Sequence, residues 1–533
     1  MQIYSFSPFG YEGALVTVEV DLRRGIPAID IVGLADNAVK ESRERMQAAI
    51  RNSGLDFPIE RVLISLSPAD LKKEGAGFDL PIALGVLAAN EANKGNKGNG
   101  ADAGERDSAP VLIMGELELS GKIRAVRGVH AAAATAAAGG IFRCIVPAAN
   151  AEEAREVNGM KVFGADTLEE AFAAMSSPEN FTEAAAHFSG TKQIFDKNAV
   201  ETNGILFPRI TDGYEFGDIR GQRQLIRGLQ IAAAGGHNVV AIGSPGCGKT
   251  MAMQKFPALL PLLTPEEAQP VTRIMSLAGL LHPAQPLVRT PPFRMPHQTA
   301  SIEGMCGGGI NCRPGEISLA HNGVLFLDEA AEFKTSVLQM LRVPLETGRI
   351  TLARAGRSTQ FPARFQLLMA ANPCPCGNFG SDTKMCLCSS RAIEMYWKKF
   401  SAPLLDRIDI RISVKNESDG TEASSAQEPP LTTELLRIGI ANAVKTQRHR
   451  QAKKNACLTP AETASFCKID EATRMLLTKA QNRYGFSPRA TASILKIGRT
   501  IADMELSAEI KQQHIAEAIQ YRKTFSNFMQ SET

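Results

Sequence analysis

The sequence has little net charge, no long apolar run and no leader-like start. Its 59 Lys and Arg residues nearly balance 56 Asp and Glu residues, leaving a formal net charge of +3. This balance excludes a histone-like polycation but not nucleic-acid binding through a local basic patch. The most apolar stretch, residues 131–149, is too interrupted to span a bilayer. The first residues, MQIYSFSPFG, lack the basic segment and apolar core of a signal peptide. We therefore expect a cytoplasmic protein with no membrane partner.

Ten cysteines without a signal peptide favour reduced thiols or a metal site over disulfides. Four of them form two Cys-x-Cys pairs, Cys374 with Cys376 and Cys386 with Cys388. Four thiols across a short polar loop could close a tetrahedral zinc site, although Cys-x-Cys spacing is less diagnostic than Cys-x-x-Cys. Free reduced thiols are the alternative to a structural zinc ion.

The length of 533 residues predicts about three or four domains. Residues 1–175 alternate strand and helix patterns and form one unit. A polar, irregular stretch, residues 176–212, is typical of a linker. In residues 213–414 buried strands alternate with helices, the pattern of an α/β fold with a parallel sheet and helices on both faces. A Ser- and Pro-rich break follows, and residues 431–529 are helix-forming sequence with few strand signals.

The strongest motif is a phosphate-binding loop between the strand at residues 239–242 and a helix. Its backbone N–H groups would wrap the phosphates of ATP. Within it, Lys249 would reach the β- and γ-phosphates, and Thr250 would hold Mg²⁺. A chance Gly-rich turn is the alternative, which the strand–loop–helix setting disfavours. The loop residues expected to bind the cofactor are Gly243, Ser244, Pro245, Gly246, Cys247, Gly248, Lys249 and Thr250.

Three further residues complete the predicted hydrolytic site. Asp328 and Glu329 follow a buried strand, where Asp328 would anchor Mg²⁺ through water and Glu329 would act as the general base. Helix capping is the alternative role for such a pair. Asn372 ends a third strand and is suited to orient the attacking water.

Two arginines are candidates for contacting nucleotide. Arg407 lies among acidic residues where a helix is expected to end, and in a ring it could reach the γ-phosphate of a neighbour. An ordinary intrachain ion pair is the alternative. Arg489, in the helical C-terminal region, is a candidate nucleotide sensor.

These motifs, in this order, resemble an AAA+ ATPase of the magnesium-chelatase branch, and more closely the ComM/YifB family. The segments that carry the closer resemblance are DIRGQ (218–222), AAAGGHN (232–238), GGG (307–309) and PGEISLAH (314–321). Two departures from the family pattern are Gln298, where a second His is usual, and the Ala330-Ala331 pair after Glu329. We expect neither departure to affect phosphate chemistry.

The resemblance implies an AAA+ core with a helical lid, preceded by an α+β ribosomal S5/Lon-protease-like domain. The family's members are hexameric ATPases that promote branch migration of DNA during natural transformation. In this branch a hairpin before the Asn strand enters the pore of the ring. The matching segment here is residues 348–366, where Arg354 and Arg357 flank the tip and could grip DNA phosphates without reading sequence. A charged, solvated hairpin edge is the alternative.

The resemblance also bears on other activities. The segment that should carry the Lon nucleophile, residues 73–79, contains no Ser, and Arg127 to His130 replace the segment with its Lys, so we do not expect proteolysis. A metallochelatase-type ATPase that remodels a partner for Mg²⁺ insertion into a porphyrin is the rival function. A nucleotide-binding adaptor with little turnover is a third, which the intact hydrolytic residues disfavour.

Overall fold

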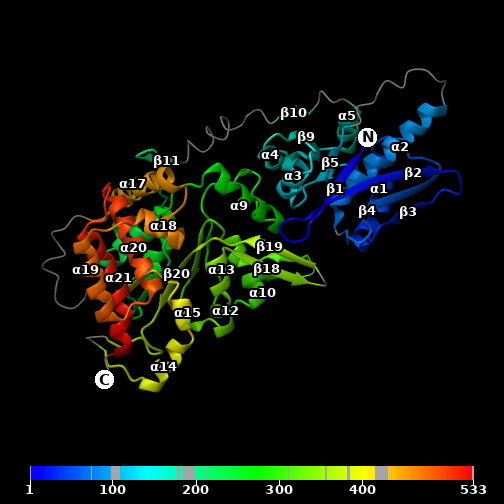
Figure 1. The fold of residues 1–533 in the computed structure, drawn as a ribbon. Helices are drawn as coiled ribbons and strands as arrows, with labels where there is room; N and C mark the ends of the chain where they lie inside the picture. Colours follow the sequence, from blue (N-terminus) through cyan, green and yellow to red (C-terminus); the bar gives the residue numbers. More distant parts are fainter. Residues whose placement is uncertain are drawn as a thin grey trace.

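The computed structural model describes residues 2–73, 75–97, 109–176, 181–183, 199–211, 213–309, 311–354, 357–380, 384–414 and 430–530. Figure 1 shows an N-terminal unit (blue to cyan), a central sheet with its hairpins (green to yellow) and a group of C-terminal helices (orange to red) in a row. In the described part of the chain, no helix combines the length and hydrophobicity that a bilayer crossing requires.

The N-terminal unit is built on an eight-stranded mixed sheet in the order β10-β9-β8-β5-β1-β2-β4-β3. Its strands are β1 (Ile3–Ser7), β2 (Ala14–Arg23), β3 (Ile29–Val32), β4 (Arg61–Ser67), β5 (Val111–Ile113), β8 (Arg143–Pro147), β9 (Lys161–Ala165) and β10 (Thr182–Glu183). Its helices are α1 (Asn37–Asn52), α2 (Asp79–Lys97), α3 (Val129–Ala138), α4 (Ala151–Arg155) and α5 (Leu168–Ser176).

Alternating side chains of this sheet supply two separate cores. Ile145 of β8 packs with α1, α2 and α5, whereas its neighbours Cys144 and Val146 pack with α3 and α4 on the other face. Both faces are therefore covered by helices, as an α+β unit requires. The sheet extends past residue 175, since β10 lies in the interval 176–212 that was expected to be a linker.

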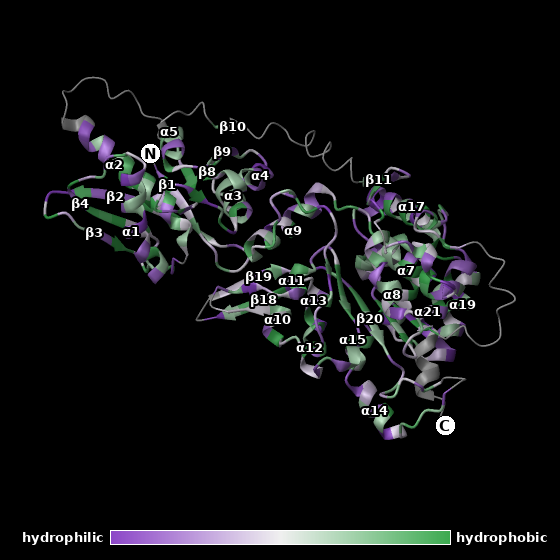
Figure 2. Ribbon diagram, turned by 180° about the vertical axis from the view of Figure 1, so that it is seen from behind, coloured by the Kyte–Doolittle hydropathy of each residue, from purple (hydrophilic) through white to green (hydrophobic). Residues whose placement is uncertain are grey.

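The central sheet has five parallel strands in the order β14-β17-β20-β13-β21. Its strands are β14 (Phe293–Arg294), β17 (Val324–Leu327), β20 (Gln366–Ala371), β13 (Val239–Gly243) and β21 (Ile410–Val414). β20 is buried along its whole length and is largely green, for hydrophobic, in Figure 2.

Helices cover both faces of this sheet. Its alternate residues divide between two cores, with Leu368 packing toward α7 and Met369 toward α12. This confirms the predicted α/β core with a parallel sheet. The helices of the core are α7 (Arg223–Gly235), α8 (Lys249–Gln254), α9 (Pro265–Ala278), α10 (Ile302–Cys306), α11 (Glu316–Leu319), α12 (Thr335–Met340), α13 (Arg342–Thr347), α14 (Ser390–Lys398) and α15 (Ala402–Leu405).

The interval 176–212, expected to be a linker, contains a β-hairpin of β11 (Ala199–Thr202) and β12 (Ile205–Pro208). Ile205 and Phe207 are buried in the same core as α7, and the guanidinium of Arg437 lies 5.0 Å from the centre of the Phe207 ring. This part of the interval therefore belongs to the packed core. The rest of the interval is largely outside the described residues.

The C-terminal region is helical, as predicted. Its helices are α17 (Thr433–Gln451), α18 (Pro460–Phe466), α19 (Glu471–Tyr484), α20 (Pro488–Met504) and α21 (Gln512–Gln530). Buried residues of α17, α20 and α21 share one hydrophobic core with α7 and one face of the central sheet. The C-terminal helices therefore pack directly on the central sheet, and their described residues share its core instead of enclosing a separate one.

The N-terminal unit contacts the central part through α3, which packs on α9. At this contact the Nε2 of His130 lies 2.8 Å from the Oε1 of Gln269, and the Ser276 hydroxyl donates to the carboxylate of Glu153. These polar groups are buried or nearly so, and burial makes their pairing obligatory for stability. The two units are thus joined by a specific polar interface.

Candidate nucleotide-binding site

The predicted phosphate-binding loop connects the buried strand β13 to α8. Gly246 (φ 83°) and Gly248 (φ 81°) adopt the left-handed conformation that favours glycine. Gly243 is required for space, since a Cβ there would lie 2.2 Å from the carbonyl oxygen of Val414 on the neighbouring strand. The loop therefore has the backbone freedom that wrapping a phosphate requires.

Lys249 is 7% exposed and lies across the loop. Its Nζ donates to the carbonyl oxygens of Gly243 (2.7 Å) and Ser244 (2.9 Å). The Oδ1 of Asn372 lies 3.5 Å from the same Nζ, because β20 is inserted beside β13 and ends at the same edge. The structure therefore brings together the predicted phosphate-binding lysine and the predicted water-orienting asparagine.

Thr250 and Asp328 meet at this edge of the sheet. The Thr250 hydroxyl donates to the Oδ1 of Asp328 over 3.0 Å, and the backbone N–H of Glu329 donates to the same oxygen. A hydroxyl and a carboxylate oxygen are hard oxygen ligands of the kind that Mg²⁺ prefers. The two residues expected to hold Mg²⁺ are therefore adjacent and chemically suited to it.

Glu329 has a left-handed backbone (φ 47°, ψ 48°), which is uncommon for a residue other than glycine. Its carboxylate accepts a hydrogen bond from the side-chain amide of Gln298. Gln298, one of the two departures from the family pattern, therefore contacts the predicted general base. The expectation that this departure leaves phosphate chemistry unaffected stays a prediction. A polar residue shortly after β14, next to the strand that carries Glu329, is the signal that could have identified this contact.

Arg407 lies at the opposite edge of the sheet. Its carbonyl oxygen accepts a hydrogen bond from Asn238, which directly precedes β13, whereas the phosphate-binding loop follows β13. Its guanidinium, 11% exposed, pairs with Glu346 of α13 and lowers the pKa of that carboxyl. Within one chain, the intrachain ion pair is what the structure contains, and Arg407 does not approach its own phosphate-binding loop.

Arg489, the second residue of α20, lies near the same edge. Its Nε is 3.9 Å from the Oδ2 of Asp406, the residue before Arg407. The Ser487 hydroxyl also donates to Asp406. The two candidate nucleotide-contacting arginines are therefore neighbours: Arg489 contacts Asp406, and Arg407 follows Asp406 in the chain.

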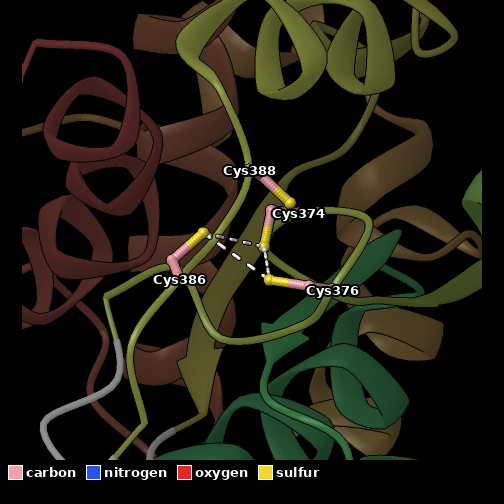
Figure 3. A group of neighbouring side chains, drawn as sticks. All are labelled: Cys374, Cys376, Cys386 and Cys388. Carbon is pink, nitrogen blue, oxygen red and sulfur yellow. Dashed lines mark hydrogen bonds between the residues drawn. The ribbon is translucent and has the colours of Figure 1, made fainter.

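The four predicted zinc ligands form one cluster (Figure 3). The sulfurs of Cys374, Cys376, Cys386 and Cys388 lie within 4.8 Å of one another. The sulfur of Cys374 is 3.3 Å from that of Cys376 and 3.6 Å from that of Cys386. Zinc–thiolate bonds of about 2.3 Å place sulfurs about 3.8 Å apart in a tetrahedron. The four thiols are free, and their number, chemistry and spacing fit a zinc ion.

The predicted pore hairpin consists of β18 (Arg349–Arg354) and β19 (Arg357–Pro362). Arg354 is exposed and its guanidinium lies 3.7 Å from the carboxylate of Glu303 in α10. The chain after α10 forms a second, smaller hairpin of β15 (Gly307–Gly308) and β16 (Arg313–Pro314). The expected tip, residues 355–356, and the side chain of Arg357 lie outside the described residues.

Two residues of the segments that match the Lon dyad, Lys73 and His130, are buried. Lys73 is fully buried and its Nζ donates to the carbonyl oxygen of Pro68. His130 is buried in the interface with α9, and burial lowers its pKa to about 4. Neither residue is placed as an exposed catalytic group.

Comparison with family profiles matches all three parts of the chain. Residues 215–422 match "Magnesium chelatase, subunit ChlI", residues 18–150 match "Subunit ChlI of Mg-chelatase", and residues 431–522 match "Magnesium chelatase, subunit ChlI C-terminal". A more limited similarity links the chain to the "Magnesium-chelatase 38 kDa subunit" of Acidiphilium rubrum, with 29% identity over 30% of this chain and 53% of that protein.

Two relatives align over nearly their whole length. "Competence protein ComM" of Haemophilus influenzae is 38% identical over 522 residues, covering 98% of this chain and 97% of the relative. "Uncharacterized protein YifB" of Escherichia coli strain K12 is 38% identical over 526 residues, covering 98% and 96%. The chain therefore belongs to the ComM/YifB family of magnesium chelatase-like, AAA+-type ATPases.

Proposed function

We propose that this protein is a cytoplasmic, hexameric ring ATPase that couples ATP hydrolysis to translocation on DNA. Its task would be branch migration in recombination or natural transformation. The observation that supports the DNA part is the hairpin β18–β19, whose exposed Arg354 lies beside Glu303 of α10, the helix that precedes the second hairpin β15–β16. A relative named for competence and aligned over 98% of the chain supports the biological setting.

Hydrolysis would use the residues gathered at the carboxyl edge of the sheet. Lys249 would bind the β- and γ-phosphates in place of its present carbonyl partners, and Asn372, 3.5 Å away, would orient the attacking water. Glu329 would take the proton of that water once its carboxylate leaves Gln298. Mg²⁺, held by Thr250 and Asp328, would neutralise charge on the phosphates.

Ring assembly is supported by the position of the two candidate arginines. Arg407 lies at the amino end of β13 and the phosphate-binding loop at its carboxyl end, about 16 Å away for five strand residues. This distance favours a role for Arg407, and for its neighbour Arg489, at the nucleotide of an adjacent subunit, where an arginine would stabilise the charge of the transition state.

The hairpin would contact the phosphates of the DNA. Arg354 is paired with Glu303 over a long 3.7 Å, and an exposed ion pair of this kind contributes little stability. Exchange of Glu303 for a DNA phosphate would therefore cost little. Such contacts carry no sequence information, which suits a motor that moves along any sequence.

The test compares ATP hydrolysis with and without forked or four-way DNA. We expect DNA to stimulate turnover, Lys249→Ala to abolish it, and Arg354→Ala with Arg357→Ala to remove the stimulation while basal turnover remains. Arg349→Ala, an exposed arginine at the base of the same hairpin, is the matched control and should respond to DNA normally. The hairpin variant should also reduce the salt dependence of DNA binding by about one unit of slope per lost phosphate contact.

The same test separates the rival function. If DNA neither binds nor stimulates turnover, the motor proposal fails, and remodelling of a partner protein, as in a metallochelatase, becomes the leading candidate. Partial similarity to a magnesium-chelatase subunit is the observation that keeps this rival in view.

The proposal also includes a structural zinc ion at the four-cysteine cluster. Its geometry fits the tetrahedral thiolate sites of zinc, and the cluster closes the loop that follows Asn372. Elemental analysis of the purified chain should find about one zinc ion per chain.

A further inference from the structure

The four-cysteine cluster shapes a turn that lies directly against the nucleotide site. The backbone N–H of Gly377 donates to the carbonyl oxygen of Cys374 over 3.0 Å, which closes a tight turn. The buried sulfur of Cys374 accepts from the backbone N–H of Phe379. On the other side, the indole N–H of Trp397 donates to the carbonyl oxygen of Pro373. The turn is thereby fixed relative to α14.

This segment touches the phosphate-binding loop at two points. At its start, the Oδ1 of Asn372 is 3.5 Å from the Nζ of Lys249. At its end, Gly377 lies against Pro245, so closely that a Cβ on Gly377 would be 2.5 Å from the Cδ of the proline ring. The segment from Asn372 to Gly377 therefore spans the site that binds the phosphates.

The phosphate-binding loop is partly open to solvent on this side. Pro245 and Gly246 are exposed, and a Cβ built on Gly246 or Gly248 meets no atom within 4 Å. Both glycines also have the conformational freedom that increases the entropy lost on ordering the loop. A rigid neighbour that holds Pro245 in place would reduce that cost, because preorganisation of a site increases its affinity.

We propose that Cys374, Cys376, Cys386 and Cys388 bind one zinc ion, and that the ion, by holding the turn against the phosphate-binding loop, sets the affinity of the nucleotide site. Metal occupancy would then control ATP binding, in addition to stabilising the fold. This inference rests on the proposed nucleotide binding at that loop and deepens it.

The experiment measures zinc content and nucleotide affinity on the full chain without DNA, using a fluorescent ATP analogue with Mg²⁺. Removal of zinc with a strong chelator should weaken nucleotide binding by about ten- to a hundredfold, the effect of a small misplacement of binding groups, and zinc should restore it. Cys388→Ser should lose zinc and show the same weakening, whereas Cys457→Ser, an exposed cysteine outside the cluster, should change neither.

Two glycine variants in the same loop distinguish the effect of the contact with Pro245 from the effect of the metal. Gly377→Ala should retain zinc but weaken nucleotide binding, because its Cβ would displace Pro245. Gly380→Ala is the matched control: Gly380 has a similar φ of 73°, but a Cβ there meets nothing within 4 Å. Gly380→Ala should therefore bind both zinc and nucleotide as the parent does. Thermal melting of every form establishes that the chain is folded.

Three results would overturn the inference, each in a different way. If the purified chain contains no zinc, or contains iron in place of zinc, the assignment of zinc to the cluster is wrong. If the zinc-free protein and Gly377→Ala both bind nucleotide as tightly as the parent, the cluster stabilises the fold but does not set the affinity of the nucleotide site. If the zinc-loaded parent does not bind nucleotide at all, the proposed nucleotide site is refuted, and this inference, which rests on that site, is refuted as well.

Discussion

Replacing Gln298 by alanine should raise the rate of ATP hydrolysis in the absence of DNA. In the structure the amide of Gln298 donates to the carboxylate of Glu329, the residue proposed to activate water. This hydrogen bond stabilises the carboxylate at its place beside Gln298, and moving the carboxylate toward a water at the γ-phosphate would require breaking the bond. The variant removes the donor and leaves Glu329 in place.

The size of the effect follows from the energy of that hydrogen bond. Hydrogen bonds to charged groups contribute about 1.5–3 kcal/mol, and the lower end applies here because Glu329 is exposed to solvent. Since each ~1.4 kcal/mol corresponds to a factor of ten in rate, we expect basal turnover to rise about tenfold. Turnover at saturating DNA should change much less, because the parent would release Glu329 under that condition.

The assay is steady-state hydrolysis of ATP with and without DNA, and two variants make it specific. His297→Ala, whose ring bonds Thr299 instead of Glu329, should leave basal turnover unchanged. Glu329→Gln should abolish turnover, and Gln298→Ala should not restore it. If Gln298→Ala leaves basal turnover unchanged or lowers it, Gln298 does not restrain the base, and the reasoning is refuted.

Three further predictions concern other parts of the chain. Arg407→Ala should lower the ATP turnover of the assembled ring by about 10³-fold without weakening nucleotide binding, as measured on size-selected rings. Normal turnover would mean that Arg407 serves only in the ion pair with Glu346. His130, with its pKa lowered by burial from 6.5 to about 4, is neutral when folded but protonated in the unfolded chain below pH 6.5. The free energy of unfolding should therefore fall as the pH is lowered from 7 to 4, and His130→Gln should flatten that fall in urea titrations. Phe207→Ala should destabilise the core by about 3–5 kcal/mol in the same assay, and a loss near zero would contradict the packing of β12.

Much of the nucleotide site could be predicted because its signals are local. The strand–loop–helix pattern around residues 243–250 and the buried strand before Asp328 are contiguous in sequence. The parallel sheet then brings their ends to one edge, since carboxyl ends of parallel strands share an edge. Asn372 could be predicted as part of the site for the same reason: its strand, β20, is parallel to β13 and β17 and lies between them, so all three strands end on the same side of the sheet.

The features that were missed depend on contacts between distant residues. Gln298 and Glu329 are 31 positions apart, and nothing in the sequence states that the residues after β14 turn back over the end of β17. The contact of Gly377 with Pro245 is of the same kind. The hairpin at β11–β12 was hidden by its polar surroundings, although the alternation of Ile205 and Phe207 is a strand signal in itself.

The division of the chain into three domains does not correspond to three independent cores. The N-terminal loop before β2 reaches the proposed DNA hairpin, where the backbone N–H of Tyr11 donates to the Thr359 hydroxyl and the Tyr11 ring packs edge-on against Phe361. Arg273 of α9 stacks on the same tyrosine. Because Phe361 is fully buried partly beneath this loop, the hairpin is held in place by residues from both units. The base of the hairpin therefore cannot move without disturbing the N-terminal unit, which ties that unit physically to the element proposed to grip DNA.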